Sequence, residues 1–176
     1  MKLPLKVSSI AVCTIRPYRL SDVANLRLAI NDPKIARMTS AIPYPYTLAD
    51  ARKWILGCQR EYRQSHSDHR NVAITIDDRV VGSISANRAG DQAELGYWLA
   101  SARHGQGIMS KVVQTFVPHV FSYWPIDRII AKTFMFNQAS ARVLEKNGFT
   151  KTAHEIRSVK KGGRWLDTYV YTRWRQ

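Results

Sequence analysis

Residues 94–113 combine the features of an anion-binding turn: a strand, a pair of glycines and the start of a helix. Gly105 and Gly107 let the backbone bend tightly and present its N–H groups. The unsatisfied amides and the positive dipole end of the following helix point at the same place. This arrangement predicts a phosphate-binding turn.

The spacing excludes two common nucleotide signatures. The chain has no Gly-x-x-x-x-Gly-Lys-Ser/Thr run of the kind that binds nucleoside triphosphates, and Ser110 stands where a dinucleotide fingerprint has its third glycine. His66 and His69 lie close in sequence but lack a cysteine or a helix-spaced partner, so a polar loop is favoured over a metal site. The ligand of the predicted phosphate-binding turn is therefore expected to be a nucleotide of another kind.

A second motif follows at residues 137–149, Asn-Gln-Ala-Ser-Ala-Arg-Val-Leu-Glu-Lys-Asn-Gly-Phe. With both motifs, the chain resembles the GCN5-related N-acetyltransferase (GNAT) superfamily, in its RimJ/RimL-like branch. Further matches at residues 14–17, 42–51 and 163–171 extend the resemblance over roughly residues 12–174.

The resemblance implies an α/β (α+β) fold: a mixed, mostly antiparallel sheet with helices on both faces and one splayed parallel strand pair. The residue pattern agrees, because residues 72–76, 80–86 and 93–99 read as an antiparallel meander. A helix connects the last of these to a strand at 128–134, so these two strands should be parallel. We expect a single domain over residues 1–176, with residues 1–11 as an N-terminal extension.

Helix ends and turns are predicted from capping and turn residues. Ser21, Thr47 and Ser110 are the expected helix N-caps, Pro118 should kink or end its helix about a turn earlier, and Gly148 should end a helix over 138–147. Gly162 and Gly163 should turn a hairpin between the last two strands.

The resemblance implies acetyl-coenzyme A as co-substrate, with its pyrophosphate on the glycine turn and its pantetheine arm between the diverging strands, paired like an added strand. The family motif Arg/Gln-x-x-Gly-x-Gly/Ala falls on His104, Gly107 and Met109, of which His104 and Met109 depart from the pattern. An amide near Trp98 or Leu99 would polarise the thioester carbonyl, so no metal is required. The cofactor-binding residues are predicted to be Trp98, Leu99, His104, Gly105, Gln106, Gly107, Ile108, Met109, Ser110 and Asn137.

Catalysis needs two proton transfers. An amine attacks only when neutral, so a base must take its proton. Glu94 is predicted for this role because it alternates with the inward Ala93, Leu95 and Tyr97 and so faces the opposite side of the strand. The alternative is an ordinary exposed carboxylate. Branch members resemble this chain in having Asn-x-x-Ser, which implies that Asn137 binds the cofactor arm and that Ser140 protonates the departing sulfur. The alternative for Ser140 is a hydroxyl bonded back to a helix carbonyl.

The acceptor side resembles the family at Tyr44, Tyr46 and Asp167, although simple packing is the alternative for the aromatics. The favoured acceptor is a protein N-terminal amine, as on a ribosomal protein. A small amine such as an amino acid, polyamine or aminoglycoside stays open, as does a non-catalytic module that binds coenzyme A or associates with nucleic acid.

The charge is strongly positive, with 27 Lys and Arg against 13 Asp and Glu, a net +14 and a pI near 10.2. Such a surface either is simply solvated or brings the protein near the ribosome or RNA.

The sequence has no apolar leader or membrane span, which predicts a cytoplasmic protein with no membrane partner. Cys13 and Cys58 are expected to be buried free thiols. A monomer or a homodimer is expected.

Overall fold

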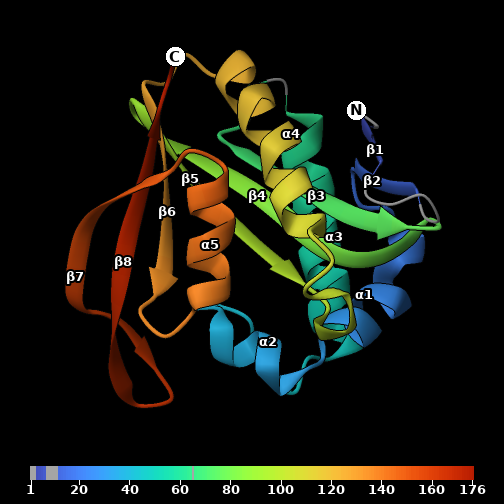
Figure 1. Ribbon diagram of the computed structural model, residues 1–176. Coiled ribbons are helices and arrows are strands. Elements are labelled where there is room, and N and C mark those ends of the chain that lie inside the picture. The colour runs from blue at the N-terminus through green and yellow to red at the C-terminus, as the bar shows by residue number, and fades with distance from the viewer. Residues whose placement is uncertain (1–2, 7–11, 65) are drawn as a thin grey trace.

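The computed structural model describes residues 3–6, 12–64 and 66–176, which form one eight-stranded sheet with helices on both faces (Figure 1). The strand order is β1-β2-β3-β4-β5-β6-β8-β7, and β5 and β6 form the parallel pair among otherwise antiparallel neighbours. The strands are β1 (Leu3–Lys6), β2 (Val12–Arg16), β3 (His69–Ile76), β4 (Arg79–Ala89), β5 (Gln92–Leu99), β6 (Arg128–Phe134), β7 (Thr150–Lys161) and β8 (Arg164–Trp174).

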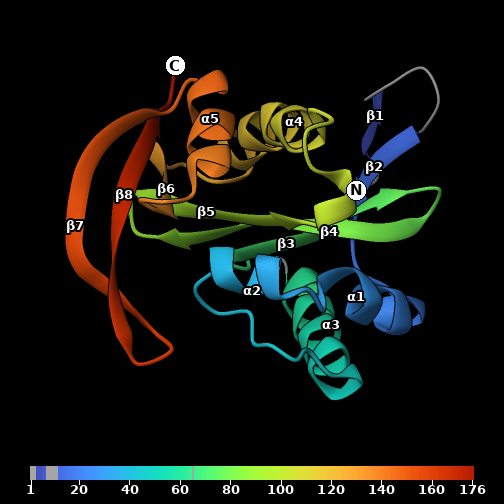
Figure 2. The same ribbon diagram turned by 60° about the horizontal axis from the view of Figure 1, so that its bottom comes forward.

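Helices α4 and α5 cover one face of the sheet, and α1, α2 and α3 lie on the other face (Figure 2). Their bounds are α1 (Val23–Ile30), α2 (Pro33–Met38), α3 (Leu48–Arg63), α4 (Ile108–Tyr123) and α5 (Gln138–Lys146), with 3₁₀ turns η1 (Leu20–Asp22) and η2 (Ser101–Arg103). Within the described part of the chain, no helix combines the length and the apolarity that crossing a membrane would require.

Two apolar clusters fill the two sides of the sheet. Phe116 and Ile129 belong to the cluster under α4 and α5, and Leu26 and Ile55 belong to the cluster under the N-terminal helices. Because both faces are covered, the inner strands are buried on both sides, and such strands read as nearly continuous apolar runs. This confirms the predicted mixed fold.

The crossover prediction is also confirmed. β5 and β6 run parallel, with Gln92, Ala93 and Glu94 opposite Arg128, Ile129 and Ile130, and the register ends at that third rung. Beyond it the two strands separate, which opens the sheet between residues 95–99 and residues 131–134. We call this opening the splay.

Two of the three predicted helix caps differ from the structure. Thr47 caps α3 as expected: its hydroxyl accepts from the Asp50 N–H at 3.1 Å, and the Asp50 carboxylate accepts from the Thr47 N–H at 2.9 Å. Ser21 is not a cap, because η1 precedes α1 and the Asp22 carboxylate accepts from the Arg19 N–H at 2.8 Å instead.

Helix α4 departs from the prediction at both ends. It begins two residues before Ser110, after Gly107 in the left-handed conformation. It also continues through Pro118 to Tyr123, whereas the sequence favoured an earlier end or a kink. Val117 and Val120 are fully buried on the inner side of this helix, and their packing outweighs the one backbone hydrogen bond that proline removes.

The C-terminal half of the chain follows the remaining predictions. Gly148, with φ 75°, follows α5, and Gly162 and Gly163, with φ 54° and 77°, turn the β7–β8 hairpin. The ammonium group of Lys161 at the hairpin tip donates to the Thr39 carbonyl just after α2. Of the predicted N-terminal extension, residues 3–6 pair with β2, and residues 1–2 and 7–11 lie outside the described residues.

A buried ion pair fixes the start of the fold. The Arg16 guanidinium, 2% exposed, donates to both carboxylate oxygens of Asp22 at 2.8 Å and to Asp78 at 2.9 Å. It thereby joins β2 to η1 and to the β3–β4 turn. Sequence reasoning identified the Thr14–Pro17 match but not this role of Arg16.

Candidate active site

The glycine turn lies between η2 and α4, at the end of β5. Gly105 and Gly107 have φ values of 76° and 72°, which glycine adopts without the penalty that a Cβ brings. A Cβ at either position would meet no heavy atom within 4 Å, so the turn is open on that side. The first turn of α4 adds N–H groups that have no partner inside the helix. Donors and free space together fit a pyrophosphate.

The side chains around this turn have partners within the protein. The ring Nε2 of His104 donates to the Leu99 carbonyl at 2.9 Å, and the Gln106 amide donates to the Ala102 carbonyl at 3.2 Å. Ile108 and Met109 are 2% and 7% exposed and belong to the core beneath α4. A large residue at position 109 is therefore compatible with the turn, because its side chain lies in the core.

Ser110 connects the two helices on this face. Its hydroxyl accepts from the Asn147 side-chain amide at 3.3 Å, and Asn147 also donates to the Val143 carbonyl at 2.8 Å. The first turn of α4 is thus tied to the last turn of α5. Ser110 acts here as a contact between helices and not as the predicted cap.

The splay lies beside this turn. Glu94 and Ile130 form the last rung of parallel pairing, and α4 starts from the end of β5. Strand edges that lack a neighbour present backbone donors and acceptors in the spacing that an extended ligand can use. The fold therefore leaves unpaired strand edges on the strand that leads, through η2, to the glycine turn.

The start of α5 brings Asn137, Ser140 and Tyr97 together. The Asn137 side-chain oxygen caps α5 by accepting from the Ser140 N–H at 3.2 Å. The Ser140 hydroxyl lies 2.9 Å from the Tyr97 hydroxyl of β5, which is also 3.3 Å from the Ser140 carbonyl. Desolvation by burial raises the pKa of Tyr97 well above its usual value.

Tyr97 is the residue of this group that sequence reasoning missed, since it was read only as part of the inward row with Ala93 and Leu95. The available signal was a hydroxyl in an otherwise aliphatic row, at the end of the strand nearest the glycine turn. Its partner Ser140 is 43 residues away, so the contact itself was not visible in the sequence.

Glu94 and Ser140 face opposite sides of the sheet. Glu94 is exposed and shares its strand face with Trp98, which packs into the cluster under the N-terminal helices. Tyr97 and Ser140 lie on the α5 side. The two side chains predicted to be catalytic are thus separated by the strand that carries the splay.

The predicted acceptor residues differ in accessibility. Tyr44 is 55% exposed and precedes the cis-proline Pro45. Tyr46 is 7% exposed, and burial raises the pKa of Tyr46 to about 12. Asp167 on β8 accepts from the Arg157 N–H at 2.8 Å and from His154 at 3.2 Å, and these contacts lower the pKa of its carboxyl group. Tyr44 is therefore the most accessible of the three.

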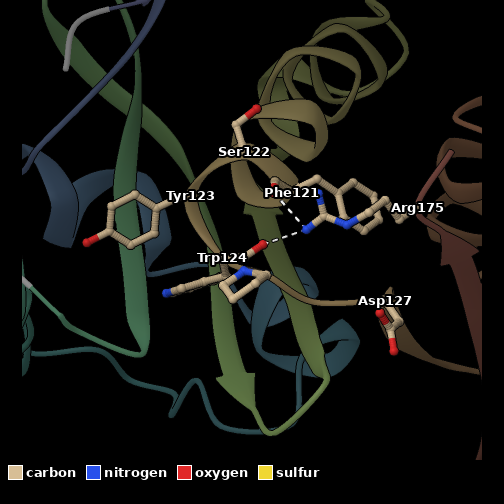
Figure 3. Close-up of a pocket in the computed structure, with 7 residues that line it drawn as sticks. Phe121, Ser122, Tyr123, Trp124, Asp127 and Arg175 are labelled. Carbon is tan, nitrogen blue, oxygen red and sulfur yellow. Dashed lines mark hydrogen bonds between the residues drawn. The ribbon is translucent and has the colours of Figure 1, made fainter.

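A separate cavity of about 430 Å³ lies at the far end of α4 from the glycine turn (Figure 3). Its guanidinium, Arg175, donates to the carbonyls of Phe121, Trp124 and Ile126 at 2.9, 2.6 and 2.7 Å. These bonds satisfy carbonyls at and just beyond the C-terminus of the helix. Arg175 therefore has a structural role. Among the described residues, no three His, Cys, Asp or Glu side chains are grouped to hold a metal ion.

The chain can be compared as a whole with known proteins. The family model of the Acetyltransferase (GNAT) domain matches residues 13–150, which include both motifs up to the end of α5. The chain belongs to the GNAT acetyltransferase family. This GNAT protein is 32% identical over 163 residues to the probable N-acetyltransferase YjcK of Bacillus subtilis (strain 168), across 89% of this chain and 90% of that protein.

Two further relatives come from the predicted branch. This GNAT protein is 31% identical over 103 residues to the ribosomal-protein-serine acetyltransferase of Escherichia coli (strain K12), across 57% of this chain and 56% of that protein. Its fold superposes with a TM-score of 0.84 on RimL, a ribosomal L7/L12 alpha-N-protein acetyltransferase in complex with coenzyme A, at 24% identity and with 98% of each chain covered. The predicted RimJ/RimL-like GNAT fold and N-acetyltransferase activity are confirmed.

Proposed function

We propose that this N-acetyltransferase moves the acetyl group of acetyl-coenzyme A to the N-terminal amine of a protein, of the ribosomal-protein type. The observation that carries the acceptor class is the similarity to an enzyme that acetylates a serine of a ribosomal protein. The net charge of +14 supports it, because a strongly basic protein repels cationic small amines and attracts the ribosome.

Backbone groups bind the cofactor in this proposal. The N–H groups of residues 106–110 hold the pyrophosphate, and Gly105 and Gly107 keep the turn open for it. Strand edges at Trp98 and Leu99 pair with the pantetheine arm, and the Asn137 side chain adds a contact from α5. His104 contributes by fixing the Leu99 carbonyl at the end of the strand.

Glu94 and Ser140 carry the proton transfers. Glu94 takes the proton of the incoming amine, directly or through water, so that the neutral amine can attack the thioester. An N–H group at Trp98 or Leu99 stabilises the negative charge that develops on the carbonyl oxygen. Ser140 donates a proton to the departing sulfur. Tyr44, which is exposed, lines the acceptor side together with Tyr46 and Asp167.

Acceptor screening tests the proposal. Purified protein is incubated with acetyl-coenzyme A and peptides with a free N-terminus, with the same peptides blocked at the N-terminus but containing lysine, and with spermidine, free amino acids and an aminoglycoside. We expect thiol release and a mass gain of one acetyl group on the free N-terminus only. Turnover of a small amine with none on the peptides would replace the protein acceptor by a small-molecule acceptor.

A further inference from the structure

The Ser140 hydroxyl has an unusual partner for a serine in the first turns of a helix. Such hydroxyls commonly donate back to a carbonyl one turn earlier. Here the side-chain contact of Ser140 among the described residues is the Tyr97 hydroxyl, which comes from the strand on the other side of the splay. Ser140 is itself held in place, because Asn137 accepts from its backbone N–H at 3.2 Å.

The distances indicate which oxygen is the main partner of the Tyr97 hydroxyl. Ser140 Oγ lies at 2.9 Å and the Ser140 carbonyl at 3.3 Å. Hydroxyl hydrogen bonds cluster below about 3.0 Å, so the Oγ is the favoured partner, and either hydroxyl can be the donor at this distance. A serine that accepts from Tyr97 keeps its own hydrogen free for a third group.

We infer that Tyr97 is a positioning residue that donates to Ser140 Oγ and so leaves the serine hydrogen directed at the departing sulfur. This inference rests on the proposed role of Ser140. As the carbon–sulfur bond breaks, Ser140 gives its proton to the sulfur and takes another from water, while the proton of the amine leaves through Glu94. Tyr97 keeps its proton throughout.

The surroundings of Tyr97 suit a permanent donor. Burial raises its pKa above the ordinary value of a phenol, so Tyr97 is protonated at neutral pH. Its hydrogen bond strengthens as negative charge builds on the serine oxygen, since a charged acceptor binds a donor more tightly than a neutral one. Tyr97 thus stabilises the moment of transfer without giving up a proton itself.

A double-mutant cycle tests the inference. Removing one neutral hydrogen bond should lower kcat of Tyr97→Phe about tenfold, with the acetyl-coenzyme A Kd unchanged. Ser140→Ala should lower kcat more. The double variant should match Ser140→Ala, because Tyr97 has nothing to position once the serine hydroxyl is gone. Tyr171→Phe is the matched control: its hydroxyl donates to Glu145 at 3.2 Å and not to Ser140, and its kcat should equal that of the native enzyme.

A second assay and a second variant cover the cases in which no peptide is acetylated or Tyr97→Phe does not fold. If no peptide is acetylated, the protein-acceptor proposal fails alone, and the cycle is measured on acceptor-free hydrolysis of acetyl-coenzyme A, which needs the same protonation of sulfur. If Tyr97→Phe does not fold, 3-fluorotyrosine at position 97 keeps the hydroxyl and should leave kcat at or above the native value. Three outcomes would each overturn the inference. The losses of kcat in the two single variants could add in the double variant, the cofactor Kd could rise in Tyr97→Phe, or kcat could fall tenfold with 3-fluorotyrosine at position 97.

Discussion

At the scale of single residues, the side chains of this site are distinguished by what covers them. Glu94 is exposed, whereas Ser140 and the inward-facing Tyr97 are both half-buried, and burial raises the pKa of Tyr97. This difference matches the work proposed for them: a base exchanges protons with water, and a positioning donor keeps its own.

Replacing Glu94 by glutamine preserves the shape of the side chain and removes the base. We expect kcat to fall by about 10²–10⁴-fold, because general base catalysis is lost. The acetyl-coenzyme A Kd should not change, because Glu94 lies on the strand face away from α5. Glu61→Gln on α3 is the control and should behave as the native enzyme. Native turnover in Glu94→Gln would make Glu94 an ordinary surface carboxylate.

The two cysteines should be inert in the folded enzyme. Burial raises the pKa of Cys13 to about 11 and that of Cys58 to about 12, so very little reactive thiolate exists at pH 8. A thiol reagent at pH 8 should modify neither residue in native protein and both in denaturant, as counted by mass. Fast modification of native Cys58 would contradict its burial between α3 and the sheet.

At the scale of elements, the proposed function makes the glycine turn and the splay act together, one holding the charged end of the cofactor and the other its arm. Gly107→Ala places a side chain on the open side of the turn at φ 72°. It should abolish the thermal stabilisation by acetyl-coenzyme A, which for the native protein is about 2.7 kcal/mol at a hundredfold excess over Kd.

Gly90→Ala provides the matched control for the Gly107 variant. Gly90 has φ 63°, and a Cβ there also meets nothing within 4 Å, but the residue lies in the β4–β5 turn. Both substitutions introduce a similar backbone strain of about 1 kcal/mol. Only Gly107→Ala should lose the cofactor-dependent shift. An equal loss in both would show that strain alone, and not the blocked turn, explains the effect.

Sequence patterns located these elements well where the signal is local. Three signals are of this kind: the strand periodicity, the pair Gly105 and Gly107, and the reciprocal cap of Thr47 and Asp50. Each is formed by residues that are close in sequence to the element they specify. The patterns failed at Ser110 and Pro118, where a left-handed glycine and buried valines decide the course of α4. They also could not reveal the Tyr97–Ser140 contact or the Arg16 network, because those depend on chain segments that meet only after folding.

At the scale of the whole molecule, the buried ion pair of Arg16 joins distant parts of the N-terminal half. Asp22→Asn leaves the 2%-exposed guanidinium without its main counter-charge and should lower the free energy of unfolding by about 3 kcal/mol. Urea denaturation measures this change. Asp68→Asn removes the half-exposed partner of Arg88 and should cost less than about 1 kcal/mol. Equal costs would show that burial does not strengthen the Arg16 pair.

The net charge of +14 predicts a property of the entire surface. If that surface brings the enzyme to the ribosome, its affinity for ribosomes or RNA should fall steeply with salt, each phosphate contact adding roughly −0.7 to −0.9 to the slope of log K against log salt. Sedimentation with ribosomes at two salt concentrations gives the slope. Binding that ignores salt, or no binding, would mean that the positive surface is merely solvated.

The splay also divides the sheet into parts with different hydrogen-exchange behaviour. Residues 95–99 keep their antiparallel partners on β4, so amides that point to that side should exchange slowly. Amides of the same strand that point into the splay have no such partner and should exchange with solvent deuterium much faster. Alternate amides along one short strand would then differ in protection. Cofactor binding should slow the fast set while leaving the slow set unchanged.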